Sequence, residues 1–169
     1  MIRLSTILSF AVLGLALHSA AQDIHTAHGV MVGEVDETSA ILQSRLSASK
    51  GLVNNDVPGA AGVGRFEISD TRDFRNSRFT EWMKADAEGD FILKTKVADL
   101  KPATRYFYRL AYGANTDSTR RSRVGTFKTL QGRQGAGEVS FVVVTGMNYN
   151  SFHYGVPRKG KRSGERMYT

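Results

Sequence analysis

An alternation of residues between two faces over Asp90–Val97 limits the possible folds of this chain more than any other feature. Phe91, Leu93, Thr95 and Val97 occupy every second position, and Lys94 and Lys96 lie between them. Successive side chains of a β-strand point to opposite faces, so this pattern predicts a half-buried strand. It favours antiparallel sheets that bury one face each.

Runs of the same kind recur at short intervals between residues 22 and 130. They predict strands at 29–34, 39–46, 65–69, 104–112 and 123–129. Turn residues separate them: we assign 54–64, including Gly62 and Gly64, to a turn-rich segment, and the polar stretch 70–77 to a loop. The best place for a helical turn is 77–87. This spacing predicts an all-β, fibronectin type III/immunoglobulin-like antiparallel sandwich over 22–130.

Tyr106 is predicted to be the corner tyrosine of this sandwich. It follows Leu100, Pro102 and Thr104 at the spacing with which such folds enter a strand from a loop. We expect its ring in the core and its hydroxyl bonded to nearby backbone. This motif indicates a fold and carries no chemistry.

Residues 1–21 have the order of segments found in a secretory signal peptide. Arg3 precedes an apolar run over 6–17, and the small residues Ser19 and Ala21 come just before Gln22. The apolar run is shorter than the roughly 20 residues that cross a bilayer. We therefore expect a secreted protein, periplasmic or extracellular, with no membrane attachment after cleavage. The chain has no Cys, so disulfides cannot support it and its core must.

The pattern changes after residue 130. Residues 131–138 are Gly-rich and polar, which is typical of a linker, and 139–145 contain the continuous apolar run Phe-Val-Val-Val. Such a run suits a strand covered on both faces, as in a parallel α/β sheet. The roughly 30 residues of 139–169 are too few to close an α/β core. We expect them to be the start of a truncated second domain.

Several of these motifs resemble the alkaline phosphatase D family of metallophosphoesterases, which begin with a small sandwich. The matches in the first two strands are Gly29, Gly33, Ser39, Leu42 and Arg45. Glu34 replaces the usual Asp, and Gln43 stands where Trp is usual. The segments 100–108 and 123–129 also match, so the resemblance covers most of the sequence after the signal peptide.

The resemblance continues across the linker into Phe141–Tyr149, which is similar to the first strand of the family's catalytic domain. That strand ends in a metal-ligating Cys, where this chain has Gly146. Glycine has no donor atom, so the resemblance implies that this ligand is missing. Asn148 and Tyr149 keep the family pattern; they are candidates for an active-site loop or are ordinary loop residues. Catalytic residues are otherwise unknown.

The resemblance implies a parent enzyme that hydrolyses phosphate esters with a divalent metal, or with iron and calcium. This chain offers few ligands: His25, His28 and His153 are its histidines after residue 21, and no Asp follows Asp117. We expect no cofactor in it and no hydrolysis by it alone. The expected function is an N-terminal accessory domain, whose partner is the catalytic domain of the same polypeptide if the gene continues. Phosphate esters would be substrates of the full enzyme.

Two other functional classes remain open. The alternative is a free-standing secreted binding or adhesion module, because the predicted sandwich ends at residue 130. Nucleic-acid binding is suggested only by the net charge of +7 and by basic clusters at 120–123 and 158–166. Those clusters lack interleaved aromatic residues, so solvated surface is favoured and no nucleic-acid partner is expected. Phosphate contacts from Lys159, Lys161, Arg162 and Arg166 are likewise less favoured than a solvated loop.

Overall fold

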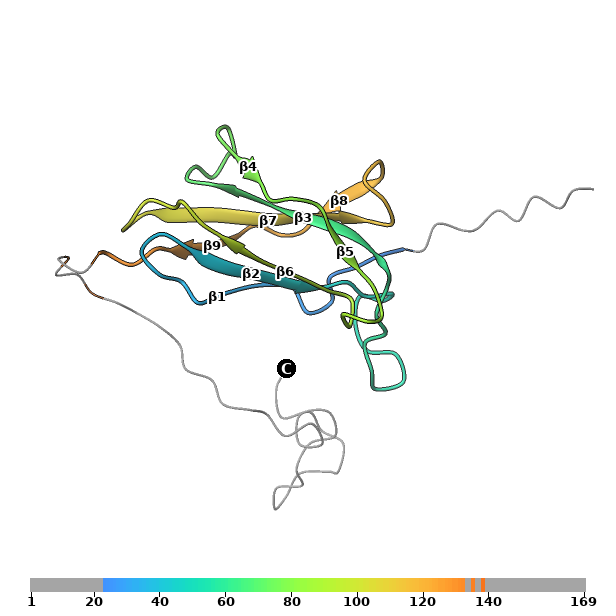
Figure 1. The fold of residues 1–169 in the computed structure, drawn as a ribbon. Helices are drawn as coiled ribbons and strands as arrows, with labels where there is room; N and C mark the ends of the chain where they lie inside the picture. The colour runs from blue at the N-terminus through green and yellow to red at the C-terminus, as the bar shows by residue number, and fades with distance from the viewer. Residues whose placement is uncertain (1–22, 133–134, 136–137, 139–169) are drawn as a thin grey trace, which may run out of the picture.

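The computed structural model describes residues 23–132, 135 and 138, and within them the chain forms β-strands and no helix (Figure 1). The strands are β1 (Val30–Gly33), β2 (Ala40–Arg45), β3 (Gly62–Ser69), β4 (Arg78–Phe79), β5 (Met83–Ala85), β6 (Ile92–Val97), β7 (Arg105–Gly113), β8 (Thr119–Arg121) and β9 (Gly125–Lys128).

These strands form two antiparallel sheets that pack face to face as two layers (Figure 1). The smaller sheet has the order β1-β2-β6. The larger has the order β4-β3-β7-β8, with β5 also paired to β3 and β9 to β7. The predicted fibronectin type III/immunoglobulin-like sandwich is therefore confirmed.

The core lies between the sheets and comes from the alternating positions seen in the sequence. Leu42, Leu46 and Leu93 from the smaller sheet's side belong to one cluster with Phe66 and Leu110 of the larger sheet, and all five are 0% exposed. Each such side chain stabilises the fold by about 1.5–3 kcal/mol when fully buried. Lys94 and Lys96 point to solvent on β6, as the alternation predicts.

Gly62 and Gly64 lie inside β3, so their assignment to a turn was wrong. A Cβ on Gly62 would lie 2.6 Å from the carbonyl oxygen of Gly113, and one on Gly64 would lie 2.5 Å from a methyl carbon of Leu93. Glycine is present because the neighbouring strand and the core come too close for a side chain. Strand β3 starts at Gly62, three residues before its predicted beginning, because residues 62–64 pair with β5.

The helical turn expected at 77–87 is also wrong, because β4 and β5 occupy that segment. Both pair with β3: Phe79 lies opposite Glu67, and Lys84 opposite Val63. Strand β8 was not predicted. It pairs with the end of β7, and the predicted strand at 123–129 is reduced to β9.

The chain enters the sandwich at one end and leaves it at the other (Figure 1). Ile24 lies beside Gly62, next to the last residue of β7, Gly113. In β9, Lys128 pairs with Arg105, the first residue of β7. The long strand β7 therefore spans the distance between entry and exit.

Candidate functional site

The residues proposed for an active-site loop, Asn148 and Tyr149, lie outside the described residues, as do Gly146 and His153. Among residues 23–132, no group of three or more His, Cys, Asp or Glu side chains could hold a metal ion. The His25 ring nitrogen Nε2 lies 3.2 Å from a carboxylate oxygen of Asp23. The residues that the structure describes therefore do not fit a dinuclear metal centre.

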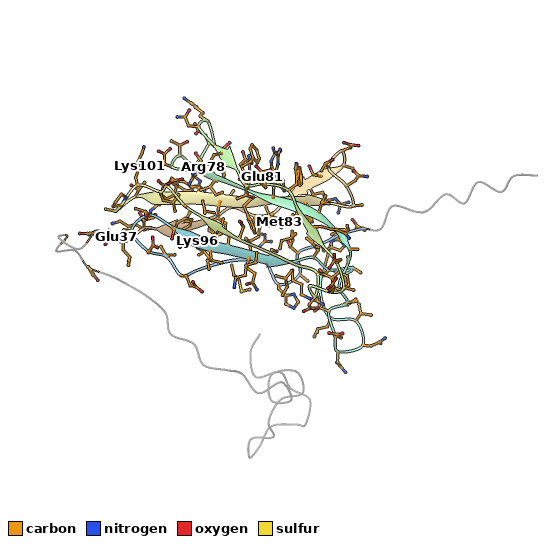
Figure 2. The ribbon with its side chains drawn as sticks, in the orientation of Figure 1. Glu37, Arg78, Glu81, Met83, Lys96 and Lys101 are labelled. Carbon is orange, nitrogen blue, oxygen red and sulfur yellow. The ribbon has the colours of Figure 1, made fainter. Side chains whose placement is uncertain are left out.

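A network of hydrogen bonds surrounds the place where the chain leaves the sandwich, which is one candidate for a functional site. We call it the exit end, and it comprises Asp36–Ser39, Lys101–Thr104 and Thr129–Leu130. Thr129 is 2% exposed, and its hydroxyl donates to the carbonyl of Lys101 at 2.7 Å. The same hydroxyl accepts the Thr104 N–H at 2.9 Å. Figure 2 shows Lys101 and Glu37 at this end.

Leu130 continues this network in both directions. Its N–H donates to the carbonyl of Asp36 at 3.0 Å, and its own carbonyl accepts the N–H of Ala103 at 2.9 Å. The Asp36 carboxylate accepts the Ser39 hydroxyl at 2.6 Å and the Thr38 N–H at 2.7 Å. These hydrogen bonds, the Ser39 hydroxyl first, hold the pKa of Asp36 below its usual range. Thr129 and Leu130, just before the predicted linker, are thus held by two other segments of the chain.

Tyr106 supports the exit end from inside the core. Its ring is 7% exposed, and its hydroxyl accepts the N–H of Lys101 at 2.8 Å. The predicted corner tyrosine is confirmed. Lys101 is also the residue whose carbonyl accepts the Thr129 hydroxyl. Tyr106 therefore links the core to the segment through which the chain leaves the sandwich.

Two residues of the strand motif have visible structural roles. Ser39 binds Asp36 at the exit end, and Arg45 joins two loops at the opposite end of β2. The Arg45 guanidinium donates to the Asp90 carboxylate at 2.9 Å and to the carbonyl of Val57 at 2.8 Å. The contacts of Ser39 and Arg45 thus stabilise the fold.

A cavity of about 400 Å³ opens between β1 and the break that separates β8 from β9. Its lining residues are Thr26, Ala27, Gly29, Val30, Tyr108, Ser122, Arg123, Val124 and Gly125. The Tyr108 hydroxyl faces the carbonyl of Val30 at 3.5 Å, and desolvation raises the pKa of this phenol. None of the lining residues is His, Cys, Asp or Glu.

The outer face of the larger sheet carries a cluster that sequence analysis missed. We call it the Arg–aromatic face. Its residues are Arg65, Glu67, Phe74, Phe79, Trp82, Arg109 and Arg121. The segment between β3 and β5 covers the sheet here, which is why β3 is buried on both faces. The sequence had predicted sheets that bury one face only.

Glu67 lies at the centre of this face and is only 4% exposed. Its carboxylate accepts Arg109 Nε at 2.6 Å and the Ser77 hydroxyl at 2.9 Å, and Arg121 Nε lies 3.4 Å away. Burial alone would raise the pKa of Glu67, but the bonds from Arg109 and Ser77 outweigh it and lower the pKa below its usual value. The group is therefore a buried, paired carboxylate.

Aromatic rings hold the arginines in place. The Arg65 guanidinium carbon lies 4.1 Å from the ring centre of Phe79 and 4.5 Å from that of Trp82. Arg109 lies 4.0 Å from the ring centre of Phe74. Arg65 Nε is buried with no hydrogen-bond partner in the described structure. Such stacking stabilises a cation by about 0.5–2 kcal/mol.

These features define an all-β sandwich domain with a firmly held exit, rather than a complete catalytic centre, in the residues described. Residues 13–131 match the family described as PhoD-like phosphatase, N-terminal domain. The match covers well over half of the chain, which therefore belongs to this family. No helix among the described residues is long and apolar enough to span a membrane.

The chain is also similar to several solved structures, and the structure of PhoD supports the fold. The structure of PhoD is 24% identical, with a TM-score of 0.50, and the match covers 63% of this chain and 19% of that one. The sensor domain of the anti-sigma factor RsgI4 in Pseudobacteroides cellulosolvens is 16% identical, with coverage of 67% and 99% and a TM-score of 0.46. A human fibronectin type III domain is 14% identical, with coverage of 64% and 88% and a TM-score of 0.44. None of the curated proteins compared with the chain matches it.

Proposed function

We propose that this chain is the N-terminal accessory domain of a secreted, metal-dependent PhoD-like phosphate ester hydrolase and hydrolyses nothing by itself. The observation that carries the proposal is the family match over residues 13–131. The chain covers about a fifth of the PhoD structure, so the proposal assigns it a supporting part of the enzyme.

The exit end supports an accessory role. Hydrogen bonds from two segments, at Asp36 and at Lys101–Thr104, hold Thr129 and Leu130, so whatever follows starts from a fixed position and direction. Fixing one part of an enzyme relative to another lowers the entropy lost when they pack together. In the proposal, this anchoring is the work of the sandwich.

Hydrolysis itself is assigned to other parts of the parent enzyme. A metal centre supplies a hydroxide nucleophile and neutralises charge on the phosphate ester. The described residues provide no group of ligands for it, and Gly146 has no donor atom where the family places a Cys. Export of the domain is proposed from residues 1–21, whose order of segments is that of a signal peptide.

The first test is a phosphatase and phosphodiesterase assay on the purified chain, with metal content measured on the same sample. PhoD is the positive control. The expected result is no turnover and no stoichiometric metal. Turnover accompanied by stoichiometric metal would contradict the proposal, because it would require a complete site within these residues.

The coding sequence beyond codon 169 provides a second test of the enzyme assignment. Asp, Asn and His residues placed at the ends of predicted strands would support it. A stop codon directly after Thr169 would refute the assignment of this product to an enzyme.

A secreted binding module is the second candidate, and one observation favours it. Among the described residues, the core cluster runs from Ile24 to Phe127. Removal of residues 131–169 should then leave the unfolding midpoint unchanged. Loss of cooperative unfolding after this trimming would argue against an independent module.

A further inference from the structure

We propose that the Arg–aromatic face docks an acidic protein surface that has an apolar group at its centre. This inference goes beyond the accessory role proposed above and does not depend on it, because it concerns a second surface of the sandwich. It rests on charge, residue type and rigidity.

Charge is divided unevenly between the two layers. Segments 62–85 and 101–128 build the larger sheet and contain twelve Lys or Arg residues against five Asp or Glu. Segments 23–61 and 86–100 build the smaller sheet and contain four against nine. The larger sheet thus has a positive surplus, which attracts and orients a negatively charged partner.

The pairing register places several of these cations on one face. Arg65 and Arg121 flank Ala111 from the two neighbouring strands, and Glu67 lies opposite Arg109. Strand neighbours share a face, so the cations and Glu67 lie together on the outer side of the sheet. Arg121 keeps 58% of its side chain exposed.

The aromatic residues supply the apolar part of the surface. Phe79 is 41% exposed although its ring also stacks on Arg65. Trp82 stacks on the same guanidinium and is half-buried. Arginine and aromatic side chains are the types most enriched where protein interfaces bind most strongly.

The face is also held rigid before any partner arrives. Arg109 is fixed between Glu67 and the Phe74 ring, and Arg65 between two aromatic rings. Side chains that are already ordered lose little entropy on binding, which favours tight and specific docking.

The distribution of carboxylates favours a protein over a nucleic acid. Asp73 and Glu81 are exposed on the segment that covers the sheet, next to its cations, and Figure 2 shows Glu81 and Arg78 along it. A uniform row of phosphates would face these acids at close range, whereas a protein surface can place a cation or apolar group opposite them. This mixture of cations and carboxylates is why we propose a protein as the partner.

The test compares two double variants of the full chain. Phe79→Ser with Arg121→Gln removes one exposed apolar residue and one cation from the Arg–aromatic face. Met31→Ser with Lys94→Gln removes the same pair of types from the outer face of the smaller sheet. Met31 is 52% exposed, and both residues pair with Gln43. The basic cluster at 158–166 is unchanged in both variants, so any contribution of this cluster to binding is the same in the two measurements.

The probes are a Glu–Tyr random copolymer, which mimics an acidic surface with apolar groups, poly-glutamate and double-stranded DNA. Binding is measured by calorimetry in about 0.15 M salt, where exposed charges further apart than about 8 Å are screened. The copolymer should bind the wild-type chain more tightly than poly-glutamate. The first double variant should weaken copolymer binding about tenfold, and the second by less than about twofold.

Equal weakening by both double variants would refute the proposal, as would equal binding of copolymer and poly-glutamate. Loss of DNA binding in the first variant, with copolymer binding unchanged, would replace the protein partner by a nucleic acid. Circular dichroism checks folding. If the double variant does not fold, Phe79→Ser alone must still weaken copolymer binding selectively, and an unchanged affinity overturns the proposal.

Discussion

Replacing Glu67 by Gln tests whether the buried carboxylate stabilises the sandwich. The substitution keeps the shape of the side chain and removes its charge. The amide oxygen can still accept one hydrogen bond, from Ser77 or from Arg109. The Arg109 guanidinium, whose side chain is only 23% exposed, would lose its ionised partner.

The expected cost follows from the contacts. The 2.6 Å bond from Arg109 Nε is charge-assisted and contributes about 1.5–3 kcal/mol. Arg121 is more than half exposed and lies 3.4 Å away, so solvent screening leaves it a small share. We expect the free energy of unfolding to fall by about 2–3 kcal/mol. For a domain of this size, that lowers the melting temperature by about 10 °C.

The same carboxylate predicts a pH dependence. The pKa of Glu67 is lowered in the folded state from its ordinary value of 4.5. A group whose folded pKa is depressed stabilises the fold above its unfolded pKa, and this contribution is lost as pH falls through the folded value. The wild-type advantage over Glu67→Gln should therefore be full at neutral pH, shrink below about pH 5 and vanish in stronger acid.

Urea unfolding of both proteins at several pH values measures this difference. Glu81→Gln is the matched control, because Glu81 is exposed on the same side of the sandwich (Figure 2). It should change the free energy of unfolding by less than about 0.5 kcal/mol. If Glu67→Gln were equally mild, or if its cost stayed constant down to pH 3, the assigned role of Glu67 would be wrong.

Two further substitutions test the exit end and the cavity. Tyr106→Phe leaves the Lys101 N–H without its acceptor and should lower the free energy of unfolding by about 1–2 kcal/mol in urea; an unchanged midpoint would show that water replaces the hydroxyl at no cost. Gly125→Ala would place a Cβ 2.4 Å from the Tyr108 ring and should destabilise by about 1–3 kcal/mol. Adding Tyr108→Ala should make Gly125→Ala nearly neutral, and the absence of this compensation in thermal melts would contradict the proposed clash.

The sequence predicted those strands whose one buried face follows a strict alternation. Leu93 and Leu110 lie in such runs, and both are fully buried. Tyr106 was also predictable, because its bond to Lys101 spans only five residues. A local pattern is enough for these predictions, because the apolar face of a strand determines which of its side chains are buried.

Features that depend on distant partners were not predictable in the same way. Gly62 looks like a turn residue until the carbonyl of Gly113 is known to lie against it. Glu67 looks like a solvated strand residue, because nothing local shows that the segment after β3 folds back over it. Its neighbours Ser77 and Arg109 are 10 and 42 residues away. A segment that folds back over a distant strand produces no periodic pattern in the sequence from which it could be predicted.

The placement of entry and exit makes the sandwich a spacer. Strand β7 has nine residues, and at about 3.4 Å per residue it measures roughly 30 Å. A segment joined ahead of Asp23 and one joined after Leu130 are therefore held apart by about that length. Because the backbone ladder determines this length, substitutions that weaken the core would change how often the spacer is folded and not how long it is. Two dyes attached at the ends would report a single distance in every folded variant.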